Sequence, residues 1–152
     1  MFVTEATGRT RRIKIEINTH EHFGSVVERP FSVISLPLTA TVAIPTYGLD
    51  ELLATKLRAL YQRRKGRDLF DLWYASERAT IVPREIVRLF GVSIARAGLA
   101  VPSPASFERN LAAKASSGAF AEVPPLLRPG VAWDPTSALA WLRDALLPFL
   151  ES

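Results

Sequence analysis

The residues best suited to chemistry gather between Lys56 and Asp71. Lys56 falls four residues after Leu52 and four before Leu60, so its ammonium lies on or beside the apolar stripe of a predicted helix. An ammonium held there can meet a phosphate or a carboxylate as a point charge. A lysine at such a position can also extend along its methylenes to reach water, and the spacing alone leaves both interpretations open.

Further charges follow Lys56 within a few helical turns. Arg63 is seven residues on and returns to the same helical face, while Asp68 and Asp71 are three apart on one side of the next predicted helix. The spacing predicts that both carboxylates point into a helical hairpin together with the cations. Two roles stay open for the aspartates, namely helix capping with internal ion pairs, or catalysis.

The basic residues also concentrate in this region. Arg63, Arg64, Lys65 and Arg67 crowd into five positions, and a second basic run extends from Arg9 to Lys14. With a formal net charge of +4, the chain favours partners rich in phosphate, but this charge does not distinguish nucleic acid from nucleotide. A solvated surface without a partner is the alternative interpretation of such a run.

The elements that must position these residues are predicted to be mainly helices. The leucine spacing after Gly48 predicts an amphipathic helix that ends near Arg64, and Gly66 is the predicted break before a second helix from about Asp68. A loop is predicted over residues 116–130, where Ser-Ser-Gly, Pro-Pro and Pro-Gly occur. Further helices are predicted over Pro83 to Ala97, over Ser106 to Ala115, and from Pro135 through Phe149.

The first 45 residues have the pattern of a sheet. Residues Arg12 to Asn18 alternate strictly between isoleucine and polar residues, which is typical of a half-buried strand. Two further strands are predicted over Phe31 to Leu38 and over Thr39 to Ile44, with prolines 30, 37 and 45 as their bounds. The chain is therefore predicted to be α+β, with a short antiparallel or mixed sheet before the helices.

Two segments resemble motifs of the AbiEii/AbiGii-type nucleotidyltransferase toxin family. The run Lys56 to Trp73, KLRALYQRRKGRDLFDLW, resembles the family's third motif, with the lysine, the arginine and both aspartates in register. The strand Lys14 to Asn18, KIEIN, is similar to its second motif, a lysine followed two residues later by a carboxylate. The resemblance implies a partial polymerase-β-like nucleotidyltransferase sheet over residues 1–47, followed by a C-terminal helical bundle over residues 48–152.

The resemblance also implies a chemistry. The resemblance implies an enzyme that uses Mg²⁺ to transfer a nucleotide from a nucleotide triphosphate to RNA. The expected target is the acceptor end of tRNA, and the expected partner is a cognate antitoxin. Carried over by position, Lys56 and Asp68 are the expected catalytic residues, Glu16 the metal ligand and Asp71 a supporting residue. The expected phosphate-binding residues are Lys14, Lys56, Arg63, Lys65 and Arg67.

One family motif is missing from the sequence. The family places a Gly-Ser turn and a pair of aspartates, one residue apart, before its second motif, whereas these 152 residues contain no Asp-x-Asp and no Asp-x-Glu. A single carboxylate is expected to bind Mg²⁺ poorly, so the chain is expected to be inactive alone. Three explanations stay open: a split enzyme, a degenerate protein that keeps a phosphate or RNA site, or a start that is not authentic. The alternative function is a non-catalytic RNA- or protein-binding module of the same descent.

Other function classes have little support in the sequence. There is no cysteine, no apolar run of roughly 20 residues and no leader with a cleavage site, so the expectation is a cytoplasmic protein without a membrane segment. His20 and His22 flank Glu21, but two histidines without cysteine make a zinc site a poor prediction. Trp133 and Trp141 are expected in the core rather than as stacking platforms for bases.

Overall fold

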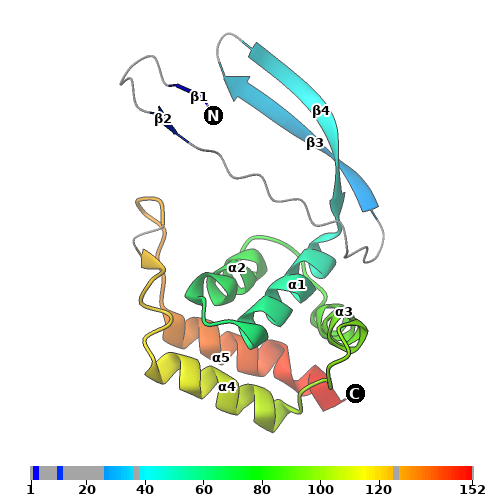
Figure 1. Cartoon of the computed structure of the whole chain (residues 1–152), viewed down its shortest axis with the longest axis vertical. Coiled ribbons are helices and arrows are strands. Elements are labelled where there is room, and N and C mark those ends of the chain that lie inside the picture. Colours follow the sequence, from blue (N-terminus) through cyan, green and yellow to red (C-terminus); the bar gives the residue numbers. More distant parts are fainter. Residues whose placement is uncertain (1, 4–9, 12–25, 36–37, 125–126, 152) are drawn as a thin grey trace.

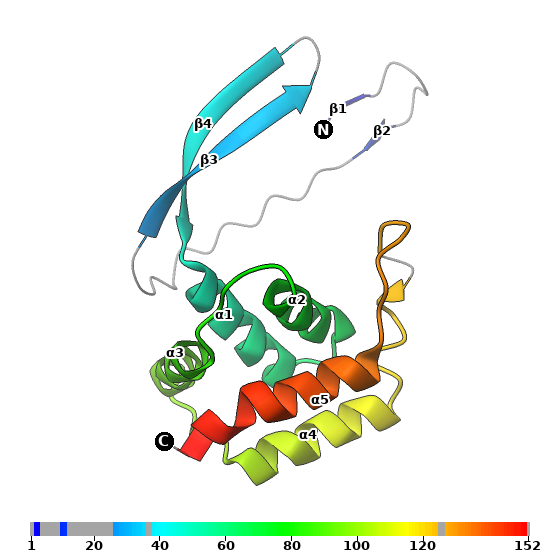
Figure 2. The same ribbon diagram turned by 180° about the vertical axis from the view of Figure 1, so that it is seen from behind.

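The computed structural model describes residues 2–3, 10–11, 26–35, 38–124 and 127–151. The predicted strand over residues 12–18, with Lys14 and Glu16, lies outside the described residues, as do His20 and His22. What is described is α+β, with antiparallel strand pairs that precede five α-helices, as Figures 1 and 2 show from opposite sides. The predicted class therefore agrees with the structure. The polymerase-β-like sheet stays a prediction.

Two strand pairs make up the described β-structure. The short strands β1 (Phe2–Val3) and β2 (Thr10–Arg11) pair with each other. The longer strands β3 (Val26–Ser35) and β4 (Leu38–Tyr47) form an antiparallel hairpin in which Val26 is opposite Tyr47 and Ser35 is opposite Leu38. Both figures show this hairpin projecting away from the helices.

The predicted bounds of these two strands were wrong. Pro30 and Pro45 lie inside β3 and β4, opposite Ala43 and Glu28 respectively, and Leu38 begins β4 instead of ending the preceding strand. A strand in a two-stranded ribbon has one side without a hydrogen-bonded neighbour, and a proline is tolerated where its missing N–H faces that side. Prolines consequently do not delimit strands here as they would in a wider sheet.

The helix α1 (Leu49–Gln62) is central to the helical region, and α2 and α3 both pack against it. Its buried positions Leu53, Leu57 and Leu60 are spaced four and three residues apart, which places them on one face. Asp50 and Glu51 in its first turn complement the helix dipole. The helix ends as predicted, because Arg63 is extended, with φ −127° and ψ 163°.

The helix α2 (Gly66–Ser76) begins earlier than predicted, since Gly66 is its first residue and not a break before it. The backbone N–H of Gly66 donates to Glu122 Oε1 at 2.9 Å, so a distant carboxylate satisfies an N–H that the helix leaves unpaired. A Cβ at this position would lie 2.5 Å from the carbonyl oxygen of Ala119 and 2.8 Å from Cα of Phe120. The close approach of the 119–123 segment therefore requires glycine.

The remaining helices start at proline, as predicted for the helices at Pro83 and Pro135, whereas the helix between them begins at Pro104, two residues before the predicted Ser106. They are α3 (Pro83–Arg96), α4 (Pro104–Ser116) and α5 (Pro135–Ala145), followed by a 3-10 helix (Leu147–Glu151). Asp134 caps α5 by accepting from the N–H groups of Thr136 and Ser137, both at 3.0 Å. The predicted last helix is thus shorter than expected and finishes in 3-10 form, so that Leu146 is a cap and Phe149 lies in the 3-10 helix.

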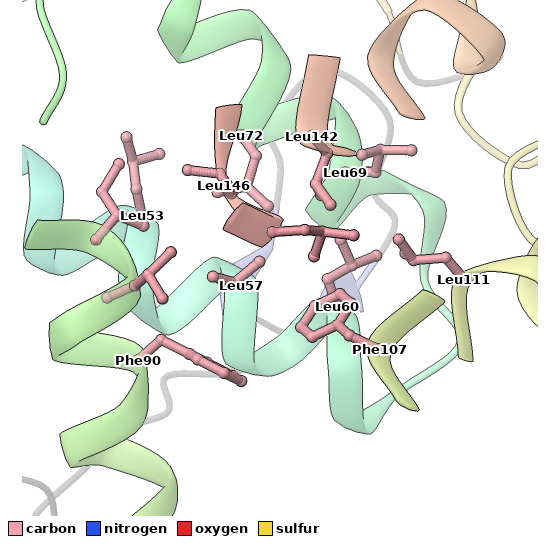
Figure 3. Packing of buried hydrophobic residues seen from close by; sticks show 14 of the residues in the cluster. Leu53, Leu57, Leu60, Leu69, Leu72, Phe90, Phe107, Leu111, Leu142 and Leu146 are labelled. Carbon is pink, nitrogen blue, oxygen red and sulfur yellow. The ribbon is translucent and has the colours of Figure 1, made fainter. Parts of the chain in front are cut away.

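One apolar core joins these helices. Leucines from α1, α2, α4 and α5 meet Phe90 of α3 and Phe107 of α4 around Leu57 and Leu60, as Figure 3 shows. Trp133 and Trp141 are half-buried against this core, which agrees with their predicted packing role. Among the described helices, none has the length and apolar character that a membrane span requires.

Candidate phosphate-binding site

Asp68 lies at the centre of the charged cluster that the sequence predicted. Its side chain is fully buried, and Arg63 donates to it twice, from Nε to Oδ2 and from Nη2 to Oδ1, each at 2.8 Å. Lys56 Nζ lies 4.0 Å from Oδ1 of the same carboxylate. Asp68 therefore neutralises cations from α1 and the turn after it, and in the described structure it forms an ion pair rather than a side-chain cap on α2.

Asp71 holds Lys56 at the edge of this cluster. Lys56 Nζ lies 2.6 Å from Asp71 Oδ2, and both side chains are 38% exposed. The ammonium is thus fixed by two carboxylates three residues apart on α2 while one side of it faces solvent. The structure brings Lys56, Arg63, Asp68 and Asp71 together, as the spacing predicted, and leaves Lys56 and Arg63 accessible to a ligand.

Arg63 keeps its charge in this cluster. The hydrogen bond to Asp68 raises the pKa of Arg63 above its ordinary value. Burial opposes this rise with a smaller effect, and the charges of Asp68 and Asp71 add to the rise. A hollow of about 400 Å³ runs along α1 beside these groups, lined by Thr55, Lys56, Arg58, Ala59, Gln62 and Arg63. Three of those six side chains are cationic, a composition suited to an anionic ligand.

The rest of the predicted basic turn divides into paired and solvent-facing residues. Lys65 Nζ lies 3.5 Å from Glu122 Oε2, a half-exposed ion pair that ties the turn to the 119–123 segment. Arg64 and Arg67 are exposed, and neither forms an ion pair with another described residue. Arg64 and Arg67 are accordingly the turn residues best placed to meet an external phosphate.

Lys114 of α4 is a member of the cluster that sequence reasoning missed. It is buried, and its ammonium donates to the carbonyl oxygens of Leu60 and Tyr61 and to Oδ1 of Asn110. Burial lowers the pKa of Lys114 to about 8, while the charge of Asp68 opposes this shift. Lys114 thus closes the C-terminal end of α1, which has no basic residue in its own last turn. One signal was available, because Lys114 continues the apolar stripe of Phe107 and Leu111.

Glu122 was also missed, and it fixes the other end of the turn. One carboxylate oxygen accepts from the Gly66 N–H and the other faces Lys65. Lys114 and Glu122 therefore clamp the turn between α1 and α2 from both sides. No periodic signal marked Glu122, because it lies in the predicted loop.

The described residues do not fit a magnesium site by themselves. No group of three or more histidine, cysteine, aspartate or glutamate side chains among the described residues could hold a metal ion. Asp68 is enclosed by its cations and Asp71 is engaged by Lys56, so neither carboxylate is available as a ligand in this arrangement. Glu16, the predicted metal ligand, lies outside the described residues.

Comparisons with known proteins show the family of this chain. No match to the chain was found among curated proteins or among solved structures. A family model described as "Nucleotidyl transferase AbiEii toxin, Type IV TA system" matches residues 1–134, which include every element from β1 through the clamped α1–α2 turn to the loop before α5. The chain therefore belongs to the AbiEii family of nucleotidyltransferase-like toxins of type IV toxin–antitoxin systems.

Proposed function

We propose that this protein is a toxin component that binds a nucleotide triphosphate beside α1 and acts on RNA, with tRNA as the expected acceptor. The observation that carries the proposal is the position of Lys56 and Arg63 at one hollow, each half-exposed and each held from behind by a carboxylate of α2. Because these two side chains are already fixed, they lose little conformational entropy when they bind phosphate oxygens.

Each member of the cluster receives a role under this proposal. Lys56 and Arg63 contact the phosphates, with Arg63 suited to bidentate contact and Lys56 acting as a point charge. Asp68, predicted as catalytic, is better suited to a positioning role because its buried oxygens already accept from Arg63. Asp71 supports Lys56. Lys65 and Arg67 extend the cationic surface toward the acceptor RNA. Lys14, which lies outside the described residues, stays a predicted phosphate-binding residue.

The proposal includes Mg²⁺ as cofactor, with Glu16 as its ligand from this chain. The metal would neutralise phosphate charge when bound. Because these 152 residues contain no Asp-x-Asp pair, we propose that transfer requires carboxylates from outside these 152 residues, and that the 152-residue chain alone transfers no nucleotide. A cognate antitoxin is the proposed protein partner.

The test is transfer of label from a radiolabelled nucleotide triphosphate to tRNA, with and without Mg²⁺. Expected results are no transfer by the chain alone, and transfer when a fragment containing the Gly-Ser turn and the Asp-x-Asp pair is added. Lys56→Ala should abolish the restored transfer. Arg109→Ala is the matched control, because it removes one exposed cation from α4 and should leave transfer unchanged. Transfer by the unaided chain would show that the carboxylates lie at positions not identified above.

A second candidate function is a binding module without catalysis. It is favoured by the internal pairing of Lys56, Arg63 and Lys65, which leaves only part of the basic turn for a ligand. This alternative predicts RNA binding that the added fragment does not convert into transfer. A filter-binding measurement run beside the transfer assay separates the two functions.

A further inference from the structure

A second pocket lies next to the hollow that contains Lys56 and Arg63, and Thr55 lines both. It has a volume of about 210 Å³ and opens between α1 and α3. Its lining includes Glu51, Ala54 and Thr55 of α1 with Leu89, Val92 and Ser93 of α3. Lys56 and Arg63, the proposed phosphate contacts, line the hollow and not this pocket.

Two polar side chains in this pocket are buried without a hydrogen-bond partner. Glu51 is 8% exposed and Ser93 is 5% exposed. Neither Glu51 Oε1 nor Ser93 Oγ has a hydrogen-bond partner in the described part of the chain. Buried polar atoms in folded proteins almost always have partners, so a pair of unpaired atoms in one cavity indicates a missing donor.

The chemistry of the pocket specifies the kind of donor. A carboxylate oxygen only accepts hydrogen bonds, so the group that faces Glu51 must carry N–H or O–H donors. Glu51 lies in the first turn of α1, where the helix dipole favours its charged form, whereas burial raises its pKa. A cationic nitrogen would supply both the donors and the opposite charge that a buried carboxylate requires.

The surrounding side chains are compatible with a cation on an apolar stem. Ala54, Leu89 and Val92 provide apolar walls. Arg88 also lines the pocket, but its guanidinium is bound by Glu85 at 2.6 and 2.7 Å, so its charge is compensated. Arg96, the other cation of the lining, likewise has an interaction partner within the chain.

We propose that the pocket between α1 and α3 binds a small primary alkylammonium, whose nitrogen donates to Glu51 Oε1 and Ser93 Oγ and whose stem packs on Ala54, Leu89 and Val92. The volume equals that of about seven liquid waters at roughly 30 Å³ each, which accommodates an amine with a short alkyl chain. The chain carries a net charge of +4, so its overall charge does not attract a small cation. Binding of an alkylammonium would therefore indicate the pocket itself and not a non-specific attraction.

The test uses n-butylamine, protonated at neutral pH, against the complete chain, with n-butanol as the uncharged probe of equal size. Two-dimensional amide NMR should show saturable shifts at Ala54, Val92 and Ser93 with n-butylamine. Binding of n-butanol should be about tenfold weaker, the difference typical of one charge-assisted hydrogen bond.

Glu51→Gln should weaken amine binding by about tenfold as well, and Ser93→Ala by a smaller factor. Glu77→Gln, at an exposed acid after α2, is the matched control and should leave binding unchanged.

Equal binding of n-butanol and n-butylamine would overturn the proposal, and this comparison needs no variant. Unchanged amine affinity in a folded Glu51→Gln protein would also overturn it. Shifts that do not saturate, or none, would mean that the pocket holds water only. Nucleotide transfer is a separate readout, because it depends on Lys56 and Arg63, which line the neighbouring hollow and not this pocket.

Discussion

Arg63 and Asp68 are joined by two parallel hydrogen bonds of 2.8 Å across the turn between α1 and α2. Arg63 is the first extended residue after α1, and Asp68 lies in the first turn of α2. The pair therefore links the end of one helix to the start of the next, and fixes the guanidinium at the edge of the hollow beside Lys56.

Asp68→Asn is expected to lower the free energy of unfolding by about 2 to 3 kcal/mol. The substitution leaves Arg63 and Lys56 facing a buried neutral group, and breaking a buried ion pair typically costs about 3 to 5 kcal/mol. The lower figure applies because Arg63 is 49% exposed and can turn toward water. Urea unfolding followed by circular dichroism measures the change.

Asp71→Asn is the matched comparison, three residues along the same helix. Both members of the Lys56–Asp71 pair are 38% exposed, so its loss should change the free energy of unfolding by less than about 1 kcal/mol. If both asparagine variants were equally stable, the central position of Asp68 would be wrong.

The stability of the protein is expected to rise with pH above about 8 through Lys114. The pKa of this lysine is lowered by burial to about 8 in the folded protein, from 10.5 in the unfolded chain. Between these values the unfolded chain binds more protons, so raising the pH favours the folded state, by roughly 1 to 3 kcal/mol in total. Thermal or urea unfolding at several pH values between 7 and 10.5 measures the trend.

Lys114→Met isolates this contribution, because every other titrating group is kept. The variant should be destabilised at pH 7, since the carbonyl groups of Leu60 and Tyr61 lose their donor. The difference in unfolding free energy between the two proteins should then depend on pH. A constant difference across the range would show that the pKa of Lys114 is not lowered by folding.

Gly66→Ala is expected to destabilise the protein by about 1 to 3 kcal/mol, although alanine is the better helix former. The new Cβ would overlap the backbone of Ala119 and Phe120, and overpacking of this kind costs about that much. The control is Gly91→Ala, inside α3, where the nearest atom to the added Cβ is 3.8 Å away. That variant should gain up to about 1 kcal/mol. Melting curves that move in the same direction for both variants would contradict the close approach at Gly66.

Arg64 and Arg67 are expected to bind RNA through phosphates. Replacing both with glutamine should weaken binding about equally for RNAs of different sequence. The slope of log affinity against log salt should become less negative by about 0.7 to 0.9 for each arginine removed. Fluorescence anisotropy at several salt concentrations measures both effects, with Arg109→Gln as control. An unchanged slope in the double variant would assign the turn to internal ion pairs alone.

Local features of this protein could be predicted from its sequence. The leucine spacing located α1 and its end, Pro83 located the start of α3, and the spacing of Lys56, Arg63, Asp68 and Asp71 placed four charges in one cluster. These predictions succeeded because a helix fixes the relative positions of residues three, four and seven apart.

Contacts between distant segments could not be predicted in the same way. Lys114 meets Leu60 across 54 positions of the chain, and Glu122 meets Gly66 across 56. Periodicity carries no information about which distant loop satisfies a helix end. The sequence pattern therefore predicts a break at Gly66, whereas in the structure its N–H donates to Glu122 and Gly66 begins α2.

The clamp made by Lys114 and Glu122 has a consequence for biosynthesis. A nascent chain that has left the ribosome only as far as Asn110 already contains the whole Lys56–Trp73 motif, but it lacks the two side chains that secure the ends of the α1–α2 turn. Because the chain emerges from its N-terminus, the charged cluster matures only after α4 and the following segment have been synthesised. A chain whose synthesis stops between these points would carry the motif without the two contacts that fix its geometry, so the cluster is complete only once synthesis of the helical region is nearly finished.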